Sequence, residues 1–123
     1  MRKSILICDD QVNVRESYKL ILENDYDLVF AMNGQDVLLY LTENKPDLII
    51  MDLKMPKMDG LTALKELKKI QPTLPVLIVT GYDSVETATT VIQAGATDYI
   101  VKPFTREVMA AKMEKVIQAK KPA

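Results

Sequence analysis

Five short apolar runs recur along this chain, and amphipathic segments separate them. The runs are almost continuously apolar rather than alternating, which is typical of strands that are covered on both faces, as in a parallel sheet. This feature constrains the fold most, because buried parallel strands need helices on both sides of the sheet. The predicted strands are residues 4–8, 27–31, 47–52, 75–80 and 98–101.

The segments that follow the strands have the spacing of amphipathic helices. Residues 11–24 and 34–44 carry apolar side chains three and four positions apart, as one face of a helix requires. A third helix begins after Asp59, a favourable N-cap residue, and ends before Pro72.

Two further helices complete the pattern. The fourth begins at a cap formed by Asp83 or Ser84 and stops at Gly95, and its threonines make it the weakest helix former. The fifth begins at Thr105 and runs close to the C-terminus. The apolar stripes predict these buried residues: Val14, Tyr18, Ile21, Leu22, Val37, Leu38, Leu41, Leu61, Leu64, Leu67, Ala88, Val91, Ile92, Met109, Met113, Val116 and Ile117.

Strands that alternate with helices predict an α/β fold with right-handed crossovers. We expect a single doubly wound five-stranded parallel sheet in the flavodoxin-like order 2-1-3-4-5, with five helices. The length of 123 residues suits one domain over residues 1–123. Sheets of this kind carry their sites beyond the carboxyl ends of the strands, at the switch point between strands 1 and 3.

Composition excludes several classes of protein. Hydrophobic residues make up 48% and charged residues 27%, and no apolar run approaches the roughly 20 residues of a membrane helix. The basic start and short apolar run are interrupted by Asp9 too early for a signal peptide, so we expect a cytoplasmic protein without membrane contact. A net charge of -1 argues against direct nucleic acid binding. Cys8 is expected to be a buried thiol.

The chain contains no histidine. Imidazole is therefore excluded as a base, metal ligand or phosphoryl carrier. Any metal site must use oxygen ligands, which suit magnesium, manganese or calcium rather than zinc or copper.

Polar residues stand at the carboxyl ends of four predicted strands. Asp9 and Asp10 follow the first, Asp52 ends the third, Thr80 ends the fourth and Lys102 follows the fifth. Any one of them alone is better explained as a helix cap or a strand residue, but five at one sheet edge are not. Two carboxylates about 4 Å apart repel by roughly 4 kcal/mol at a dielectric near 20, so a cation is needed. One lysine and a dication would balance three acids, which suits phosphoryl chemistry.

The motifs in which these residues lie resemble those of a known family. "DD" after the first strand, "MDLKMPKMDG" after the third, "VTG" at the fourth and "DYIVKPF" at the fifth are similar to the response regulator receiver domain of two-component signalling. The resemblance extends from Ile5 to about Ile117. Each motif alone is weak, whereas four in order at these spacings are specific.

The resemblance implies a phosphorylation site with a metal ion. Asp52 is similar to the aspartate that accepts a phosphoryl group from a phosphohistidine on a sensor histidine kinase or a histidine phosphotransfer protein. Asp10, Asp52 and the backbone carbonyl of Lys54 are similar to the ligands of Mg2+ or Mn2+, and Asp9 to the acid that holds metal-bound water or completes the ligand shell.

The resemblance also implies a conformational switch. Thr80 is similar to the hydroxyl that bonds the phosphoryl group, and Lys102 to the ammonium that pairs first with the acceptor and then with that group. Tyr99 is similar to the aromatic side chain that turns inward when Thr80 moves, and the Lys102-Pro103 bond to a cis peptide. Such a protein is a signalling phospho-acceptor rather than an enzyme, although it catalyses its own Mg-dependent phosphotransfer and autodephosphorylation.

Three other functions are consistent with an α/β sheet of this kind. A haloacid dehalogenase-like phosphatase needs a second aspartate two positions after its nucleophile, where this chain has Lys54. A nucleotide- or flavin-binding module needs a G-x-G-x-x-G or P-loop after the first strand, and neither is present. A degenerate receiver that acts only by protein interaction remains an alternative, disfavoured because all five site residues are present.

The output of the domain stays open. The chain is either a stand-alone receiver or the front of a longer regulator, with an output domain or a homodimer as the element that it controls. Val12 and Leu20 lie off the buried stripe of the first helix, and we interpret them as an apolar patch on which a helical kinase partner docks.

Overall fold

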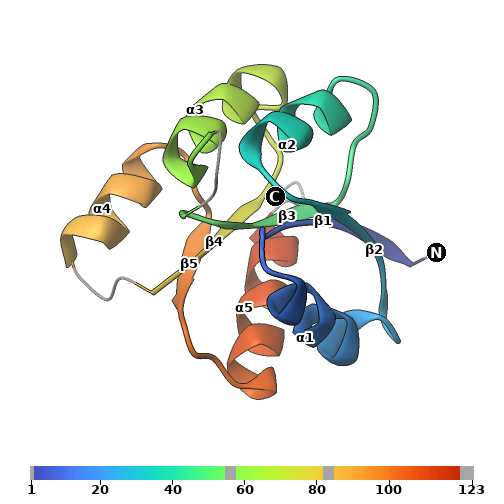
Figure 1. Ribbon diagram of the computed structural model, residues 1–123. Coiled ribbons are helices and arrows are strands. Elements are labelled where there is room, and N and C mark those ends of the chain that lie inside the picture. The colour runs from blue at the N-terminus through green and yellow to red at the C-terminus, as the bar shows by residue number, and fades with distance from the viewer. Residues whose placement is uncertain (1, 55–57, 82–84, 120–123) are drawn as a thin grey trace.

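A computed structural model describes residues 2–54, 58–81 and 85–119 of the chain. These residues form a five-stranded parallel sheet and five helices in alternating order (Figure 1). None of the described helices has the length and apolar character needed to cross a membrane. The elements are β1 (Lys3–Cys8), α1 (Val12–Leu22), β2 (Tyr26–Ala31), α2 (Gly34–Leu41), β3 (Leu48–Asp52), α3 (Gly60–Ile70), β4 (Val76–Thr80), α4 (Val85–Gln93), β5 (Asp98–Val101) and α5 (Arg106–Ala119).

The strand order is β2-β1-β3-β4-β5, and every neighbouring pair is parallel. The predicted fold class and strand order are therefore confirmed. Figure 1 shows α1 and α5 on one face of the sheet and α2, α3 and α4 on the other. The doubly wound arrangement covers the central strands on both sides, which explains why their sequences are continuously apolar.

Alternate residues of each strand pack into two separate hydrophobic cores, one on each face of the sheet. Ile5 and Ile7 belong to the cluster that includes Tyr18 of α1 and Met113 of α5. Leu6 lies on the opposite face, in the cluster with residues of α2 and α3. Successive side chains of a strand point to opposite faces, so one short run supplies both layers.

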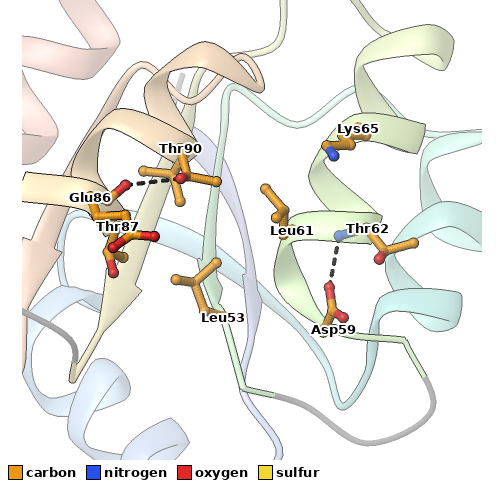
Figure 2. Close-up of a pocket in the computed structure, with 9 residues that line it drawn as sticks. Leu53, Asp59, Leu61, Thr62, Lys65, Glu86, Thr87 and Thr90 are labelled. Carbon is orange, nitrogen blue, oxygen red and sulfur yellow. Dashed lines mark hydrogen bonds between the residues drawn. The ribbon is translucent and has the colours of Figure 1, made fainter.

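Side chains define several helix ends. The Asp59 carboxylate accepts a hydrogen bond from the Thr62 amide at 2.8 Å (Figure 2), and the Thr105 hydroxyl accepts one from the Val108 amide at 3.1 Å. Both predicted caps are confirmed. Gly95, after α4, has a φ of 116°, a conformation that favours glycine.

One prediction, the N-cap at Asp83 or Ser84, concerns residues outside the described ranges.

The predicted apolar stripe of α4 is partly wrong. Val91 is buried, but Ile92 is 44% exposed. Helix α4 lies towards the β4–β5 side of the sheet, as Figure 1 shows, so only a narrow face of it reaches the core. The width of a buried face depends on where a helix crosses the sheet, which the spacing of apolar residues does not specify.

Candidate functional site

The carboxyl ends of β1, β3, β4 and β5 lie along one edge of the sheet. In the parallel register Cys8 pairs with Met51, and Thr80 pairs with Val101. The Lys102 amide donates a hydrogen bond of 2.8 Å to the Thr80 carbonyl, which ties the residue after β5 to the end of β4. This register places the residues that follow these strands side by side.

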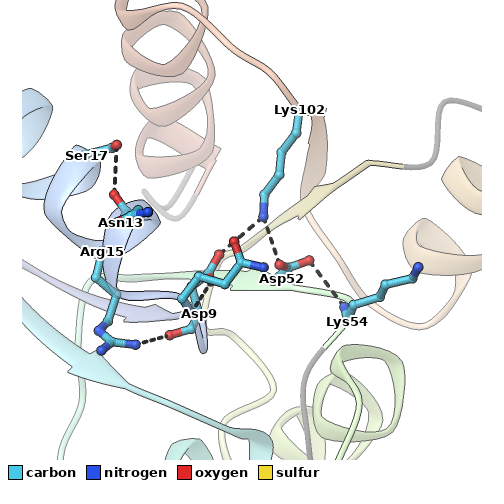
Figure 3. A network of polar contacts seen from close by, with 8 residues as sticks. Asp9, Asn13, Arg15, Ser17, Asp52, Lys54 and Lys102 are labelled. Atoms are coloured by element: carbon cyan, nitrogen blue, oxygen red, sulfur yellow. Dashed lines mark hydrogen bonds and ion pairs between the residues drawn. The ribbon is translucent and has the colours of Figure 1, made fainter.

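Lys102 joins two of the predicted acids. Its Nζ atom lies 2.9 Å from Asp52 Oδ2 and 3.3 Å from Asp9 Oδ2 (Figure 3). The Asp9 side chain is 1% exposed, that of Asp52 12% and that of Lys102 26%. The predicted convergence is confirmed for these three residues, whose formal charges sum to -1.

The loop after β1 fixes Asp9 from several sides. The Gln11 amide donates to Asp9 Oδ1 at 2.9 Å, and the Asp9 amide donates to the Ala31 carbonyl of β2 at 3.2 Å. Arg15 of α1 donates to the Asp9 carbonyl at 2.9 Å (Figure 3). Sequence reasoning missed Arg15, because a contact to a backbone carbonyl six positions away belongs to no motif.

The turn after β3 orients Asp52. The Lys54 amide donates to Asp52 Oδ1 at 3.2 Å, while the other carboxylate oxygen faces Lys102. Gly60 donates its amide to the Leu53 carbonyl at 2.8 Å, and a Cβ atom at Gly60 would lie 2.3 Å from the Asp52 carbonyl oxygen. Glycine is therefore required here by close approach of α3 to the end of β3. The glycine directly after the Asp59 cap is the sequence signal of this close approach.

Burial and charge raise the pKa values of three groups at the site. Burial raises the pKa of Asp9, and the Gln11 amide and the Lys102 ammonium oppose that effect only partly. Burial would lower the pKa of Lys102, but Asp52 and Asp9 outweigh it and raise the pKa above its ordinary value. Burial, followed by the charge of Asp9, raises the pKa of the Cys8 thiol to about 12. The predicted buried thiol is thus confirmed, and its environment disfavours the thiolate.

The remaining predicted site residues lie around this cluster. Asp10 is exposed, and none of the hydrogen bonds or ion pairs found among the described residues involves its carboxylate. Thr80 is 1% exposed at the end of β4. The Tyr99 ring is half-buried against the α2–α4 side of the core, with Lys112 Nζ 5.8 Å from its centre. The Lys102-Pro103 peptide bond is cis, as predicted.

The donor atoms at this edge suit a hard cation. Asp9 and Asp52 bring carboxylate oxygens to one place, and Asp10 and Lys54 follow them by one and two positions in the chain. Such ligands fit magnesium or manganese rather than zinc. Within the described residues, no three acidic, thiol or imidazole side chains are already gathered as a metal cluster.

A doubly wound domain with an anionic site at its switch point is the class that this geometry defines. The family model of the response regulator receiver domain matches residues 5–114. The chain is 37% identical to the transcriptional regulatory protein ZraR of Salmonella typhimurium over 92% of its own length, and 36% identical to the response regulator MprA of Mycobacterium sp. over 96%. A CheY-like receiver domain protein of Methanospirillum hungatei has a TM-score of 0.90 and 30% identity, with 98% of this chain and 97% of that one covered.

The chain belongs to the response regulator receiver domain family of two-component signalling. It is therefore related to signalling proteins. It spans 26% of the length of ZraR and 52% of that of MprA, so these relatives contain segments that have no counterpart in the given sequence.

Proposed function

We propose that Asp52 accepts a phosphoryl group from a phosphohistidine of a sensor histidine kinase or a histidine phosphotransfer protein. The bond between phosphorus and the imidazole nitrogen breaks, and a bond from phosphorus to an Asp52 carboxylate oxygen forms. The imidazole nitrogen keeps the electron pair and takes a proton from water. The observation that carries this proposal is the 2.9 Å contact between Lys102 Nζ and Asp52 Oδ2 at the switch point of the sheet.

The geometry favours Asp52 over the other acids as the acceptor. Asp9 is almost fully buried, and one of its oxygens accepts from the Gln11 amide. Asp10 is exposed and lies outside the described ion pairs. Asp52 combines partial exposure with a lysine contact, so a donor can reach it while Lys102 neutralises the incoming charge.

A carboxylate is a weak nucleophile, so alignment and charge neutralisation must supply the rate. Asp10, Asp52 and the carbonyl of Lys54 would hold Mg2+ or Mn2+, and Asp9 would orient its water. The bound metal ion would supply positive charge to the transferring phosphoryl oxygens. Lys102 stays at the acceptor and pairs with the phosphoryl group after transfer. Hydrolysis of the phosphorylated Asp52 by water at the same site would return the protein to its starting state.

Phosphorylation would change the conformation through Thr80 and Tyr99. A phosphoryl group has a larger negative charge and several acceptor oxygens, which favour a hydroxyl that turns towards it. Helix α4 is held through a narrow face, since Val91 is buried while Val85 is 84% exposed. A modest change at the end of β4 would therefore shift the position of α4 within an existing equilibrium.

The output is an effect on another protein or domain. The names of ZraR and MprA describe regulators, and by analogy this domain would control an output domain or a homodimer in the cytoplasm, without binding nucleic acid itself. Val12 and Leu20 on α1, which are 60% and 73% exposed, would form part of the surface that meets the kinase.

Intact-mass spectrometry tests the proposal. In the presence of Mg2+ and a small phosphoryl donor such as acetyl phosphate, the wild-type protein should gain one phosphoryl group that hydroxylamine removes. Asp52→Asn should abolish the gain, whereas Asp25→Asn, an exposed aspartate away from the site, should label normally. Full labelling of the Asp52→Asn variant would overturn the assignment. A wild-type protein that neither labels nor responds to Mg2+ would instead favour the degenerate receiver.

A further inference from the structure

Strand β2 lies at one margin of the sheet (Figure 1). It pairs with β1 on one side, and no described strand pairs with its other side, where Arg2 donates a hydrogen bond of 2.6 Å to the Tyr26 carbonyl and the open edge therefore begins at Leu28. Its six residues, YDLVFA, include no proline and only one charged residue, Asp27. Proline and charged residues protect edge strands from pairing, and an edge that has few of them offers its backbone donors and acceptors to a further strand.

The two edge strands of the sheet differ in length and exposure. In β2 the apolar residues Leu28, Val29 and Phe30 are only half-buried, although their partners on β1 are completely buried. The opposite edge strand, β5, has four residues and alternates between buried and half-buried positions. Strand β2 therefore presents the longer and more apolar edge.

A groove of about 390 Å³ lies between β2 and α2. Ala31 contributes only a methyl group to its floor, so the space between strand and helix is left unfilled. Phe30, Leu39 and Tyr40 supply apolar walls, and Leu39 is 73% exposed. The groove runs beside the free edge and can receive side chains of an added strand.

This α2-side groove is acidic. Asp36 and Glu43 line it, and its lining contains no lysine or arginine. Neither carboxylate takes part in any ion pair found within the described ranges. A basic side chain would complement both acids.

A second groove, of about 380 Å³, lies on the α1 side of the same strand. Tyr26, Leu28 and Phe30 form its apolar part. Of its charged residues, Lys19 pairs with Glu16 and Arg2 pairs with Asp27, whereas Glu23 takes part in none of the ion pairs found among the described residues. Apolar side chains of an added strand would pack against Tyr26, Leu28 and Phe30 in this α1-side groove, whose other lining residues are charged.

We propose that the free edge of β2 binds an extended segment of a partner protein as a sixth strand. The partner segment alternates basic with apolar residues. Its basic side chains enter the acidic groove beside α2, and its apolar side chains enter the groove beside α1. Because side chains of a strand alternate between faces, one segment fills both grooves while its backbone bonds to the edge.

Repulsion between acidic groups argues against a second copy of this chain as the partner at the edge of β2. Antiparallel pairing of two β2 strands about a two-fold axis would keep both α2 helices on the same face of the joined sheet. The acidic grooves of the two copies would then be neighbours, and β2 itself has no basic residue to place in them. Like charges across such a junction are destabilising.

An NMR titration of the full chain tests the proposal. The probe is a blocked hexapeptide of alternating lysine and valine, and the matched controls are the glutamate–valine peptide and the lysine–valine peptide with N-methylated backbone amides. We expect the unmodified lysine–valine peptide alone to shift the amide resonances of β2 and α2. The absence of shifts at β2, or equal binding of the glutamate–valine peptide, would overturn the proposal.

Variants that neutralise one acid of the α2-side groove provide a second test of the proposal. Asp36→Asn and Glu43→Gln should each weaken binding about two- to fivefold and reduce its dependence on salt. Glu107→Gln, which removes an exposed acid on α5, should bind as the wild type does. Unchanged affinity in both groove variants would contradict the proposed charge complementarity. A concentration-dependent dimer whose shifted amides map to β2 would assign this edge to a second copy and overturn the proposal.

Discussion

The two ends of β5 carry clusters of the same chemical groups in opposite proportions. Beyond its carboxyl end, one ammonium group, that of Lys102, serves two carboxylates, those of Asp9 and Asp52. At its start, the carboxylate of Asp98 contacts two ammonium groups, those of Lys112 at 3.2 Å and Lys115 at 3.1 Å. The formal charges sum to -1 in the first cluster and to +1 in the second.

The pKa values of Asp98 and Asp9 follow this difference in charge between the two clusters. Burial would raise the pKa of Asp98, but the Tyr99 amide and the Lys115 and Lys112 ammonium groups outweigh it and lower the pKa. At Asp9, burial dominates and the pKa is raised. The Asp98 cluster therefore holds α5 against β5 with its acid fully satisfied, whereas the site cluster is left short of positive charge and can accept a cation.

The largest expected difference comes from removing one lysine in each cluster. Lys102→Met leaves the nearly buried Asp9 and the adjacent Asp52 without their ammonium group, so we expect a loss of about 2–4 kcal/mol in the free energy of unfolding. Lys112→Met leaves Lys115 in place and should cost less than about 1 kcal/mol. Urea denaturation at pH 7 measures both.

Magnesium provides the control for this pair of variants. If the site cluster lacks positive charge, Mg2+ should stabilise Lys102→Met clearly and Lys112→Met no more than the wild type. Equal losses of stability in the two variants would show that the clusters do not differ in the way described.

A smaller effect is expected from converting one acid in each cluster to its amide. Asp98→Asn removes a carboxylate that two lysines and an amide stabilise, and we expect a loss of about 1–2 kcal/mol at pH 7. Asp9→Asn removes a buried charge that repels Asp52, so stability should stay constant or rise by up to about 1 kcal/mol. Thermal and urea unfolding of both variants give the comparison. A marked loss for Asp9→Asn would contradict it.

The first cluster could be predicted from the sequence, and the second could not. Parallel strands bring their carboxyl ends to one edge, so acids and a lysine that follow buried runs must meet there. The lysines that hold Asp98 lie 14 and 17 residues away on a helix whose rotation about its axis is set by packing. Apolar spacing correctly predicted the buried methionines of α5, but it does not fix which exposed lysines reach a neighbouring strand.

Close backbone contacts were likewise beyond sequence reasoning. Arg15 and Gly60 shape the site through the carbonyl oxygens of Asp9 and Asp52, and every residue has such an oxygen. Their roles depend on how near a loop or helix passes, which only the assembled fold determines. The exposed position of Ile92 has the same origin.

The pH dependence of stability separates the clusters further. Because the pKa of Asp98 is lower in the folded than in the unfolded protein, its contribution is present above the ordinary carboxyl pKa of about 4 and is lost as the pH falls through the lowered folded value. We expect the difference in stability between the wild type and Asp98→Asn to shrink between about pH 5 and pH 2. Urea titrations across this range measure it, with Asp25→Asn as a control. A difference that stays constant would mean that Asp98 acts through shape rather than charge.

The smallest expected effect is that of Lys115, the more exposed lysine of the Asp98 cluster. Its side chain is 71% exposed, against 34% for Lys112. Solvent therefore screens its ion pair with Asp98, and forming the pair costs the conformational entropy of a long side chain. We expect Lys115→Met to lower the free energy of unfolding by less than about 0.5 kcal/mol at low salt and by nothing measurable at 1 M salt.

In the Lys112→Met background the same change should cost more, because Asp98 would then lose its last ammonium group. A double-mutant cycle measures this coupling, and its absence would mean that the two lysines do not share the acid.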